Sequence, residues 1–194
     1  MIDFDAAVQQ VRLLGRGLVA IDGLPVSGKS TLAQRLEDEL GATVLYLDDF
    51  VRPEGEWRGS AKPGFPFPYF RYDEFMAAVI DLAEGRQARY RRYDWAAGRL
   101  SDDWHVLRPD GLVVVEGVSS LHPRLAPRYD LRLWVESDAS TTLEASLARG
   151  VGDWEDAWRN LFMPSVALYL ASDPRQRADY CVAGRGAVAV QPFL

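Results

Sequence analysis

Residues 20–32 read AIDGLPVSGKSTL, an apolar run that ends in a glycine and continues, four residues later, with a second glycine followed by Lys, Ser and Thr. Gly23, Gly28, Lys29 and Ser30 satisfy the pattern G-x-x-x-x-G-K-[ST]. Glycine lets the backbone bend close to a ligand without a Cβ clash. The amides of such a loop point inward at the start of a helix, where the helix dipole also favours an anion. The stretch therefore predicts a phosphate-binding loop.

The side chains of this loop suit a nucleoside triphosphate. Lys29 can reach the β- and γ-phosphates, and the Ser30 hydroxyl can ligate Mg²⁺. Thr31 can add a contact to the α-phosphate. The alternative is that glycine and serine merely form a turn, but a predicted strand precedes the motif and a predicted helix follows it, which is the context that the motif requires. We expect ATP and Mg²⁺ to bind along Gly23–Thr31, with Ser27 among the binding residues.

Hydrophobic periodicity predicts a chain in which strands and helices alternate. Such alternation implies a parallel sheet with helices on both faces. Strands are expected at residues 17–22, 43–49, 112–117, 130–136 and 178–184. Helices are expected at residues 4–14, 73–84 and 139–149, from the loop to Gly41, and in an aromatic-rich region where Pro164 forces a kink or a new start. Residues 51–71 are expected to form a long loop.

Polar residues follow the apolar part of two further predicted strands. Asp48 and Asp49 follow TVLYL, and Glu116 follows LVVV. Ligands of parallel sheets bind beyond the carboxyl ends of the strands, so these acids and the loop are expected at one edge. We expect Asp48 at the end of a strand beside the first one, where it could face the γ-phosphate.

The bulk properties limit the class of protein. A chain of 194 residues allows one sizeable core, so we expect a single domain spanning 1–194. The net charge of −6 argues against nucleic acid as the partner. No apolar run approaches the roughly 18 residues of a membrane helix, and the acidic N-terminus does not resemble a signal peptide, so a cytoplasmic location is expected. The basic segment Arg86–Trp95 has two interpretations, a solvated edge beside buried aromatics or an anion site. Homo-oligomerisation stays open.

Other signals narrow the kind of nucleotide protein. The chain lacks the N-K-x-D stretch of GTPases and the Asp-Glu strand end of motor ATPases. A carboxylate near the γ-phosphate can accept the proton of an attacking hydroxyl, and Asp48 is favoured over Asp49 for that role. Capping the following segment, or binding magnesium through water, is the alternative for both. Glu116 needs a partner such as hydrated Mg²⁺, or a salt bridge to an arginine or Lys29.

The ordered segments GLPVSGKST, LDDF, YDW and VVVEG, followed by a helix ending in Arg and by RADYCV, resemble the uridine kinase-like family of P-loop kinases. That family also includes phosphoribulokinase, pantothenate kinase and nicotinamide riboside kinase. The resemblance implies a P-loop NTPase fold, an α/β domain with a five-stranded parallel sheet flanked by helices. It also implies that Asp48 is the catalytic base, that Glu116 lies near the metal, and that Arg149 opens a short lid at about 149–157. An ordinary helix-end charge is the alternative for Arg149.

The chain departs from uridine kinases at the acceptor site. Those enzymes continue Y-D-F with two residues and a histidine, where YDWAAG places Gly98. Tyr93, Asp94 and Trp95 still resemble an acceptor wall, with an aromatic face for stacking and a carboxylate for hydroxyls, while a core aromatic is the alternative for Trp95. Asp49 is a further candidate for acceptor binding. The aromatics between residues 57 and 72 either close over the substrate or fill the core.

The sequence thus predicts a Mg²⁺-dependent kinase that transfers the γ-phosphoryl group of ATP to a hydroxyl of a nucleoside-like metabolite. Asp48, Lys29 and Arg149 would be the catalytic residues. Pantothenate-like and sugar acceptors stay open. The alternative from another class is a nucleotide-dependent switch or accessory ATPase that acts on a protein partner.

Overall fold

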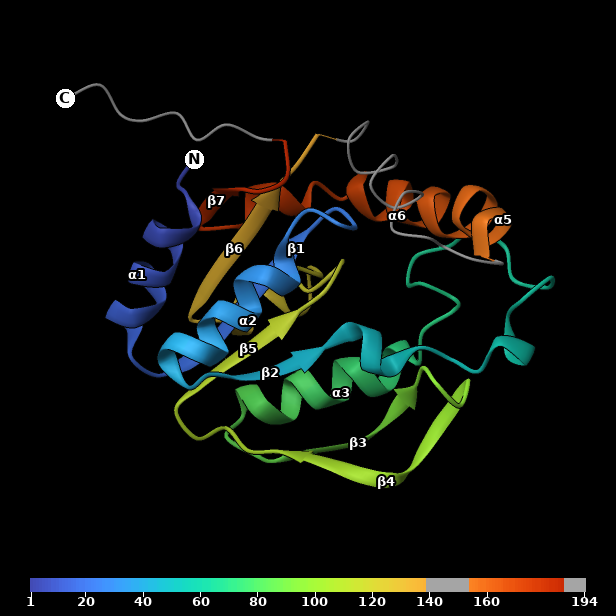
Figure 1. Cartoon of the computed structure of the whole chain (residues 1–194), viewed down its shortest axis with the longest axis horizontal. Coiled ribbons are helices and arrows are strands. Elements are labelled where there is room, and N and C mark those ends of the chain that lie inside the picture. The colour runs from blue at the N-terminus through green and yellow to red at the C-terminus, as the bar shows by residue number, and fades with distance from the viewer. Residues whose placement is uncertain (139–153, 187–194) are drawn as a thin grey trace.

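The computed structural model describes residues 1–138 and 154–186 and contains a parallel β-sheet between layers of helices (Figure 1). In the described part of the chain, the sheet has five strands in the order β2-β5-β1-β6-β7, and every neighbouring pair is parallel. The predicted sheet of the P-loop NTPase fold is therefore confirmed. The strands are β1 (Gly17–Gly23), β2 (Thr43–Tyr46), β5 (Leu112–Glu116), β6 (Leu131–Glu136) and β7 (Tyr180–Ala183).

Helices cover both faces of this sheet because each face of its central strands is apolar. On one face, α1 (Phe4–Leu14) and α2 (Lys29–Leu40) bury their apolar stripes against β1, β5 and β6. On the other face lie α3 (Tyr72–Ala83), α5 (Glu155–Ala157), a π-helical turn (Trp158–Phe162) and α6 (Met163–Leu170). The described segments contain no helix that is both long and apolar enough to span a bilayer. Short 3-10 turns complete the chain at Leu47–Phe50, Glu54–Glu56, Ala126–Arg128 and Pro174–Arg177.

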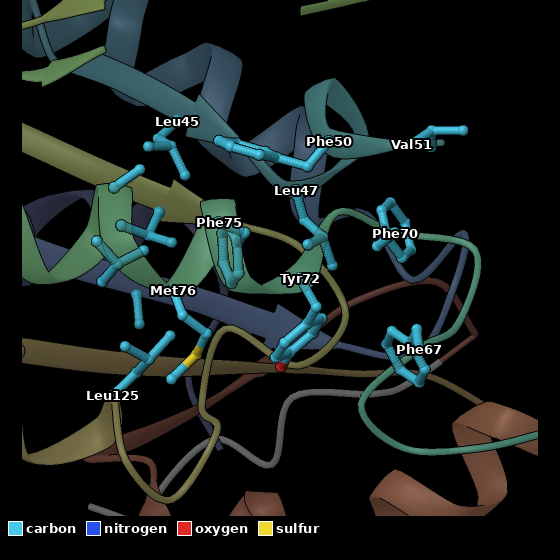
Figure 2. Packing of buried hydrophobic residues seen from close by; sticks show 14 of the residues in the cluster. Leu45, Leu47, Phe50, Val51, Phe67, Phe70, Tyr72, Phe75, Met76 and Leu125 are labelled. Atoms are coloured by element: carbon cyan, nitrogen blue, oxygen red, sulfur yellow. The ribbon is translucent and has the colours of Figure 1, made fainter. Parts of the chain in front are cut away.

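The core on the α3 face is rich in aromatic rings. Figure 2 shows Tyr72, Phe75 and Met76 of α3 packed below the segment that carries Leu47 and Phe50. The ring centroids of Phe50 and Phe75 are 5.6 Å apart in an edge-to-face arrangement. Such pairs add to the stabilisation that burial of the rings already provides. This packing fixes the segment after β2, which contains Asp48, against the body of the protein.

The strand predicted at 43–49 is too long, and its expected neighbour is wrong. β2 ends at Tyr46, and Asp48 and Asp49 lie in the 3-10 turn Leu47–Phe50. In addition, β2 pairs with β5, which separates it from β1. The apolar residues of the turn, Leu47 and Phe50, are buried like strand residues, so the hydrophobic pattern continued past the point where the hydrogen-bonded ladder stops.

An antiparallel hairpin that was not predicted lies outside α3 (Figure 1). It consists of β3 (Ala88–Asp94) and β4 (Arg99–Leu107). Tyr90 and Tyr93 of β3 are buried, whereas Arg91 and Arg92 between them are half-buried and exposed, and Arg89 before them is exposed. The basic segment is therefore the solvated face of a strand beside buried aromatics, the first of its two interpretations.

The C-terminal helical region restarts at the proline, as expected. Pro164 is the second residue of α6, and the turn before it is π-helical. Proline has no N–H to continue the regular ladder, which accounts for the irregular turn. The helix predicted at 139–149 lies outside the described residues, as do Arg149 and the first part of the expected lid.

Candidate active site

The predicted phosphate-binding loop connects β1 to α2. Gly23 ends β1 with φ 148°, and a Cβ there would collide with the backbone oxygen of Val135. Gly28 precedes the helix with φ 110° in the left-handed region. No side chain caps the first turn of α2, whose residues are all described. Its amides are thus placed to donate to an anion, as the motif predicts.

Two serines of the loop differ in their surroundings. Ser27 is fully buried, and its hydroxyl has no hydrogen-bond partner among the described residues. Ser30 starts α2, and its hydroxyl lies 3.5 Å from Oε1 of Glu116. A buried hydroxyl without a partner is costly, so the position of Ser27 fits a ligand at the loop. Thr31 is exposed at the rim.

Lys29 is the cation of the loop. Its side chain is buried, and Nζ donates to the backbone oxygen of Leu24 over 2.7 Å. The ammonium group therefore stays inside the bend that the loop makes. From there it also acts on Glu116, whose pKa it lowers.

Glu116 ends the central strand β5 and is buried. Burial raises the pKa of Glu116 to about 7, against the lowering effect of Lys29, while Asp48 and Asp22 raise it further. A nearby cation would stabilise the ionised form of this carboxyl group. Glu116 and Ser30 together offer two oxygen ligands, which suits Mg²⁺ because that ion keeps several waters and binds phosphates as well.

The two neighbouring aspartates of the 3-10 turn point to different places. Asp48 is exposed and lines the cavity next to the loop. Asp49 instead faces the hairpin, where its carboxylate accepts from Tyr90 over 3.2 Å and pairs with Arg92 at 3.2 Å. Burial raises the pKa of Asp49, and Arg92 opposes that shift. The structure therefore brings Asp48, and not Asp49, to the phosphate-binding loop.

A cavity of about 690 Å³ extends from the loop along the edge of the sheet. Lys29, Asp48 and Glu116 contribute charged groups to its lining. The lining also contains a large aromatic group: Trp57, Phe67, Tyr69, Phe70, Trp95, Trp154, Trp158 and Phe162. Trp57 of the 51–71 loop is buried in the core and also lines the cavity. The position of this side chain therefore agrees with both interpretations of the loop's aromatics, as core residues and as residues beside a substrate.

The predicted acceptor residues are only partly brought together. Trp95 lines the cavity at 55% exposure and lies edge-on to Tyr93, with ring centroids 5.0 Å apart. Asp94 is exposed, and its Oδ1 accepts from the amides of Ala96 and Ala97, each at 3.0 Å. This carboxylate therefore stabilises the tight turn between β3 and β4. Neither Asp94 nor Asp49 lines the cavity.

Asp22 forms a buried hub that sequence reasoning missed. Its carboxylate accepts from the amides of Gly23, Ser119 and Leu121 and from the hydroxyl of Tyr169, the last over 2.5 Å. Burial raises the pKa of Asp22, and these donors oppose the shift. Asp22 thereby connects β1, the turn after β5 and α6. The sequence feature that could have indicated this hub is an acidic residue within the apolar run GLVAID.

Trp154, Trp158 and Phe162 were also missed as cavity residues. They belong to the helical region after residue 153, more than one hundred residues from the phosphate-binding loop. Their aromatic character was visible in the sequence, but their place at the cavity depends on how α5 and α6 pack. Arg149, expected at the lid, lies outside the described residues.

Comparisons with known proteins agree with this geometry. No family model matches the chain. The uridine kinase of Staphylococcus aureus strain JH9 is 23% identical over 139 residues, which cover 68% of this chain and 67% of that protein. A possible uridine kinase from Bacillus stearothermophilus superposes with a TM-score of 0.70 at 20% identity, over 92% of this chain and 96% of that one. For a proposed fructose transport system kinase from Silicibacter sp. TM1040, the TM-score is 0.63 at 23% identity, over 94% and 99%.

The sheet order, the loop between β1 and α2 and these structural similarities define a P-loop kinase fold. The sequence similarity to that uridine kinase spans about two thirds of the chain, so the chain resembles the uridine kinase-like P-loop kinases. Proteins of this class are phosphotransferases with a hydroxyl group as acceptor.

Proposed function

We propose that the protein is an ATP-dependent kinase that phosphorylates a hydroxyl group of a nucleoside-like small molecule. The observation that carries this proposal is that Lys29, Asp48 and Glu116 line one cavity with an aromatic wall. A phosphate-binding loop, a base and a stacking surface within one cavity are the parts that such a transfer needs.

The phosphate end would hold ATP·Mg²⁺ through residues of the chain whose chemistry fits it. The amides of Gly23–Thr31 and the ammonium group of Lys29 would bind the phosphates, and Ser27 would gain a partner for its buried hydroxyl. Ser30 and Glu116 would hold the cation. When bound, ATP·Mg²⁺ supplies the phosphoryl group and the metal charge that offsets its negative oxygens.

Asp48 would act as the base. The carboxylate of Asp48 lines the cavity and can accept the proton of an acceptor hydroxyl there, whereas Asp49 faces the hairpin, where it contacts Arg92 and Tyr90. Lys29 would stabilise the charge that develops on the transferred group. By resemblance, Arg149 would assist from the lid. Trp95 would stack on the acceptor, with Tyr93 supporting its ring.

The proposal is tested by a coupled assay of ADP release with ATP·Mg²⁺ and a panel of nucleosides, sugars and pantothenate. An accepted nucleoside should raise ADP release well above the rate with ATP alone. Slow hydrolysis that no small alcohol stimulates would instead favour the switch or accessory ATPase.

The matched pair Asp48→Asn and Asp49→Asn tests the assignment of the base. Asp48→Asn should lower kcat by about 100-fold or more with little change in the KM for ATP. Asp49→Asn should retain kcat within a few-fold, because its carboxylate contacts the hairpin and not the cavity. Full activity of Asp48→Asn with a confirmed acceptor would contradict the assignment of Asp48 as the base.

A further inference from the structure

The turn that contains Asp48 is weakly held by its own hydrogen bonds. It is the 3-10 helix Leu47–Phe50, and the bond that closes it, from the amide of Val51 to the backbone oxygen of Asp48, measures 3.5 Å. Among the described residues, no side chain caps this turn. Short 3-10 helices have poor hydrogen-bond geometry, so contacts from other segments must fix the main chain that carries Asp48.

Arg71, the residue before α3, provides two such contacts. Its side chain is only 7% exposed. The backbone N–H of Arg71 donates to the oxygen of Phe50 over 2.7 Å, and its Nη2 donates to the backbone oxygen of Asp49 over 2.8 Å. The guanidinium carbon also lies 5.4 Å from the centroid of the Phe50 ring. One residue therefore binds two consecutive carbonyl groups of the turn, directly after Asp48.

The same guanidinium group connects the turn to two further segments. Nη2 of Arg71 also donates to the backbone oxygen of Arg91 in β3 over 2.7 Å, and Nη1 donates to Glu74 of α3 over 2.5 Å. A planar guanidinium binds several acceptors in a fixed geometry, whereas a lysine ammonium group is a point charge on a flexible stem. The turn, the hairpin and the start of α3 are thus joined at one side chain.

Packing alone does not account for this arginine. Nε of Arg71 is buried and has no hydrogen-bond partner among the described residues. A buried donor without a partner costs free energy, and burial also lowers the pKa of Arg71 against the opposing effect of Glu74. An apolar residue would avoid both costs but could not bind the carbonyl groups of Asp49 and Arg91. The role of the arginine is therefore to hold the main chain beside Asp48.

Arg71 does not line the cavity, so its effect on phosphoryl transfer would pass through the turn that it holds. We propose that Arg71 is a positioning residue, which fixes the 3-10 turn so that the Asp48 carboxylate stays at the cavity beside the phosphate-binding loop. This inference rests on the proposed function, in which Asp48 is the base. It adds to that function a residue that contacts neither ATP nor the acceptor.

Removal of the guanidinium group tests whether Arg71 affects transfer. Arg71→Met keeps most of the side-chain stem and loses the donors. We expect kcat to fall by about 10-fold or more and the KM for ATP to stay within about 3-fold, because a small displacement of a reacting group costs a large factor in rate. Arg71→Lys should recover little of this loss. Rates are normalised to the number of ATP sites measured by calorimetry, so that unfolded protein is not counted.

Arg52→Met is the matched control. Nε of Arg52 donates to the backbone oxygen of Phe70 over 2.9 Å, and Nη1 pairs with Glu56 at 3.4 Å. Arg52 therefore combines a main-chain hydrogen bond with an ion pair, as Arg71 does, but its side chain binds neither carbonyl group of the turn. We expect kcat of Arg52→Met to stay within about 2-fold of the wild type, because exposed ion pairs contribute little.

A double variant tests whether Arg71 acts through Asp48. In the Asp48→Asn background the carboxylate is absent, so its position no longer matters. Arg71→Met should then lower kcat by less than about 3-fold, because the effects of residues that act as a unit are not additive. The same fold loss in both backgrounds would indicate a structural role only and would overturn the inference.

Amide hydrogen exchange gives a readout that does not depend on transfer. Exchange of the Val51 amide, which closes the turn, is measured by NMR without nucleotide in the wild type, Arg71→Met and Arg52→Met. We expect this amide to exchange about 10-fold faster or more in Arg71→Met and at the wild-type rate in Arg52→Met, because loss of the contacts lets the turn open locally. Equal exchange in the wild type and Arg71→Met would refute the positioning role.

The results distinguish this inference from the proposed function. If Asp48→Asn is fully active, or if no acceptor is phosphorylated, the proposed function fails, while faster exchange in Arg71→Met would still show that Arg71 holds the turn. If transfer depends on Asp48 but Arg71→Met leaves kcat unchanged, the inference fails and the proposed function stands.

Discussion

The hydroxyl of Ser30, in the first turn of α2, lies 3.5 Å from the carboxylate of Glu116 at the end of β5. This contact joins the phosphate-binding loop to the neighbouring strand of the sheet. Both groups are oxygen ligands of the kind that Mg²⁺ prefers, and both line the cavity that contains Asp48.

Replacing Glu116 by glutamine should weaken the response to magnesium. The amide keeps the shape of the side chain but loses the charge that attracts the cation. We expect the Mg²⁺ concentration for half-maximal activity to rise by about 10-fold or more, by analogy with the loss of groups that support metal ligands. Titration of kinase activity with Mg²⁺ measures this. Glu39→Gln on the surface of α2 is the control, and an unchanged magnesium dependence in Glu116→Gln would contradict the assignment.

The same carboxylate should make the metal-free protein sensitive to pH. Burial raises the pKa of Glu116 from 4.5 to about 7, so between these values the folded protein holds a proton that the unfolded chain has lost. The contribution of this group to the free energy of unfolding is fully present below pH 4.5 and is lost as the pH rises to about 7. The loss is on the order of 3 kcal/mol for a shift of this size.

Urea unfolding with EDTA at a series of pH values measures that loss. Between pH 4.5 and about 7, the wild type should lose stability relative to Glu116→Gln, which has no proton to release. Parallel curves for the two proteins would show that Glu116 does not titrate in this range.

The hydrogen bond from Tyr169 to Asp22 should contribute strongly to stability. Tyr169→Phe removes a donor from a fully buried carboxylate and keeps the ring that packs beside Phe65. We expect a loss of about 1–3 kcal/mol in the free energy of unfolding. Tyr180→Phe is a matched control, because its half-buried hydroxyl donates to Gln10 over 3.1 Å. Urea unfolding should show a clearly larger loss for Tyr169→Phe, and equal losses would refute the hub.

Gly117, directly after Glu116, should be needed for the position of Asp48. A Cβ at Gly117 would collide with the side chain of Leu47, which precedes Asp48 in the 3-10 turn. Gly117→Ala should therefore lower both kcat and the melting temperature. Gly111→Ala is the control, since its φ of 82° is equally left-handed but the space around it is open. It should cost about 1 kcal/mol in stability and leave kcat unchanged. Equal kcat values in the two variants would argue against coupling through Leu47.

The parts of the fold that local chemistry determines could be predicted from the sequence. The loop motif required glycines at Gly23 and Gly28, and the structure has left-handed or strained backbone at both. The helix predicted at 4–14 is found at those residues, and the central strand predicted at 112–117 is found at 112–116, because their apolar patterns match one periodicity throughout.

Strand order and the hairpin could not be predicted in the same way. The pairing of β2 with β5 depends on non-local packing that no local pattern records. In the hairpin, β4 is largely exposed, so its apolar alternation is weak, and the arginines of β3 obscured the buried Tyr90 and Tyr93. The sequence therefore indicated candidate site residues on that strand without showing where their side chains lie. In the structure, the Asp94 carboxylate accepts hydrogen bonds from the amides of the turn that follows it.

The aromatic end of the cavity comes from the 51–71 loop, the tip of the hairpin and the helical region after residue 153, whereas the phosphate-binding loop and Glu116 belong to the sheet and α2. Under the proposed function, the choice of acceptor and the chemistry of transfer would therefore reside on separate pieces of the chain. Changes in the peripheral pieces would then alter which alcohol is accepted without changing the residues proposed for phosphoryl transfer, which would make this scaffold a starting point for engineering new kinases.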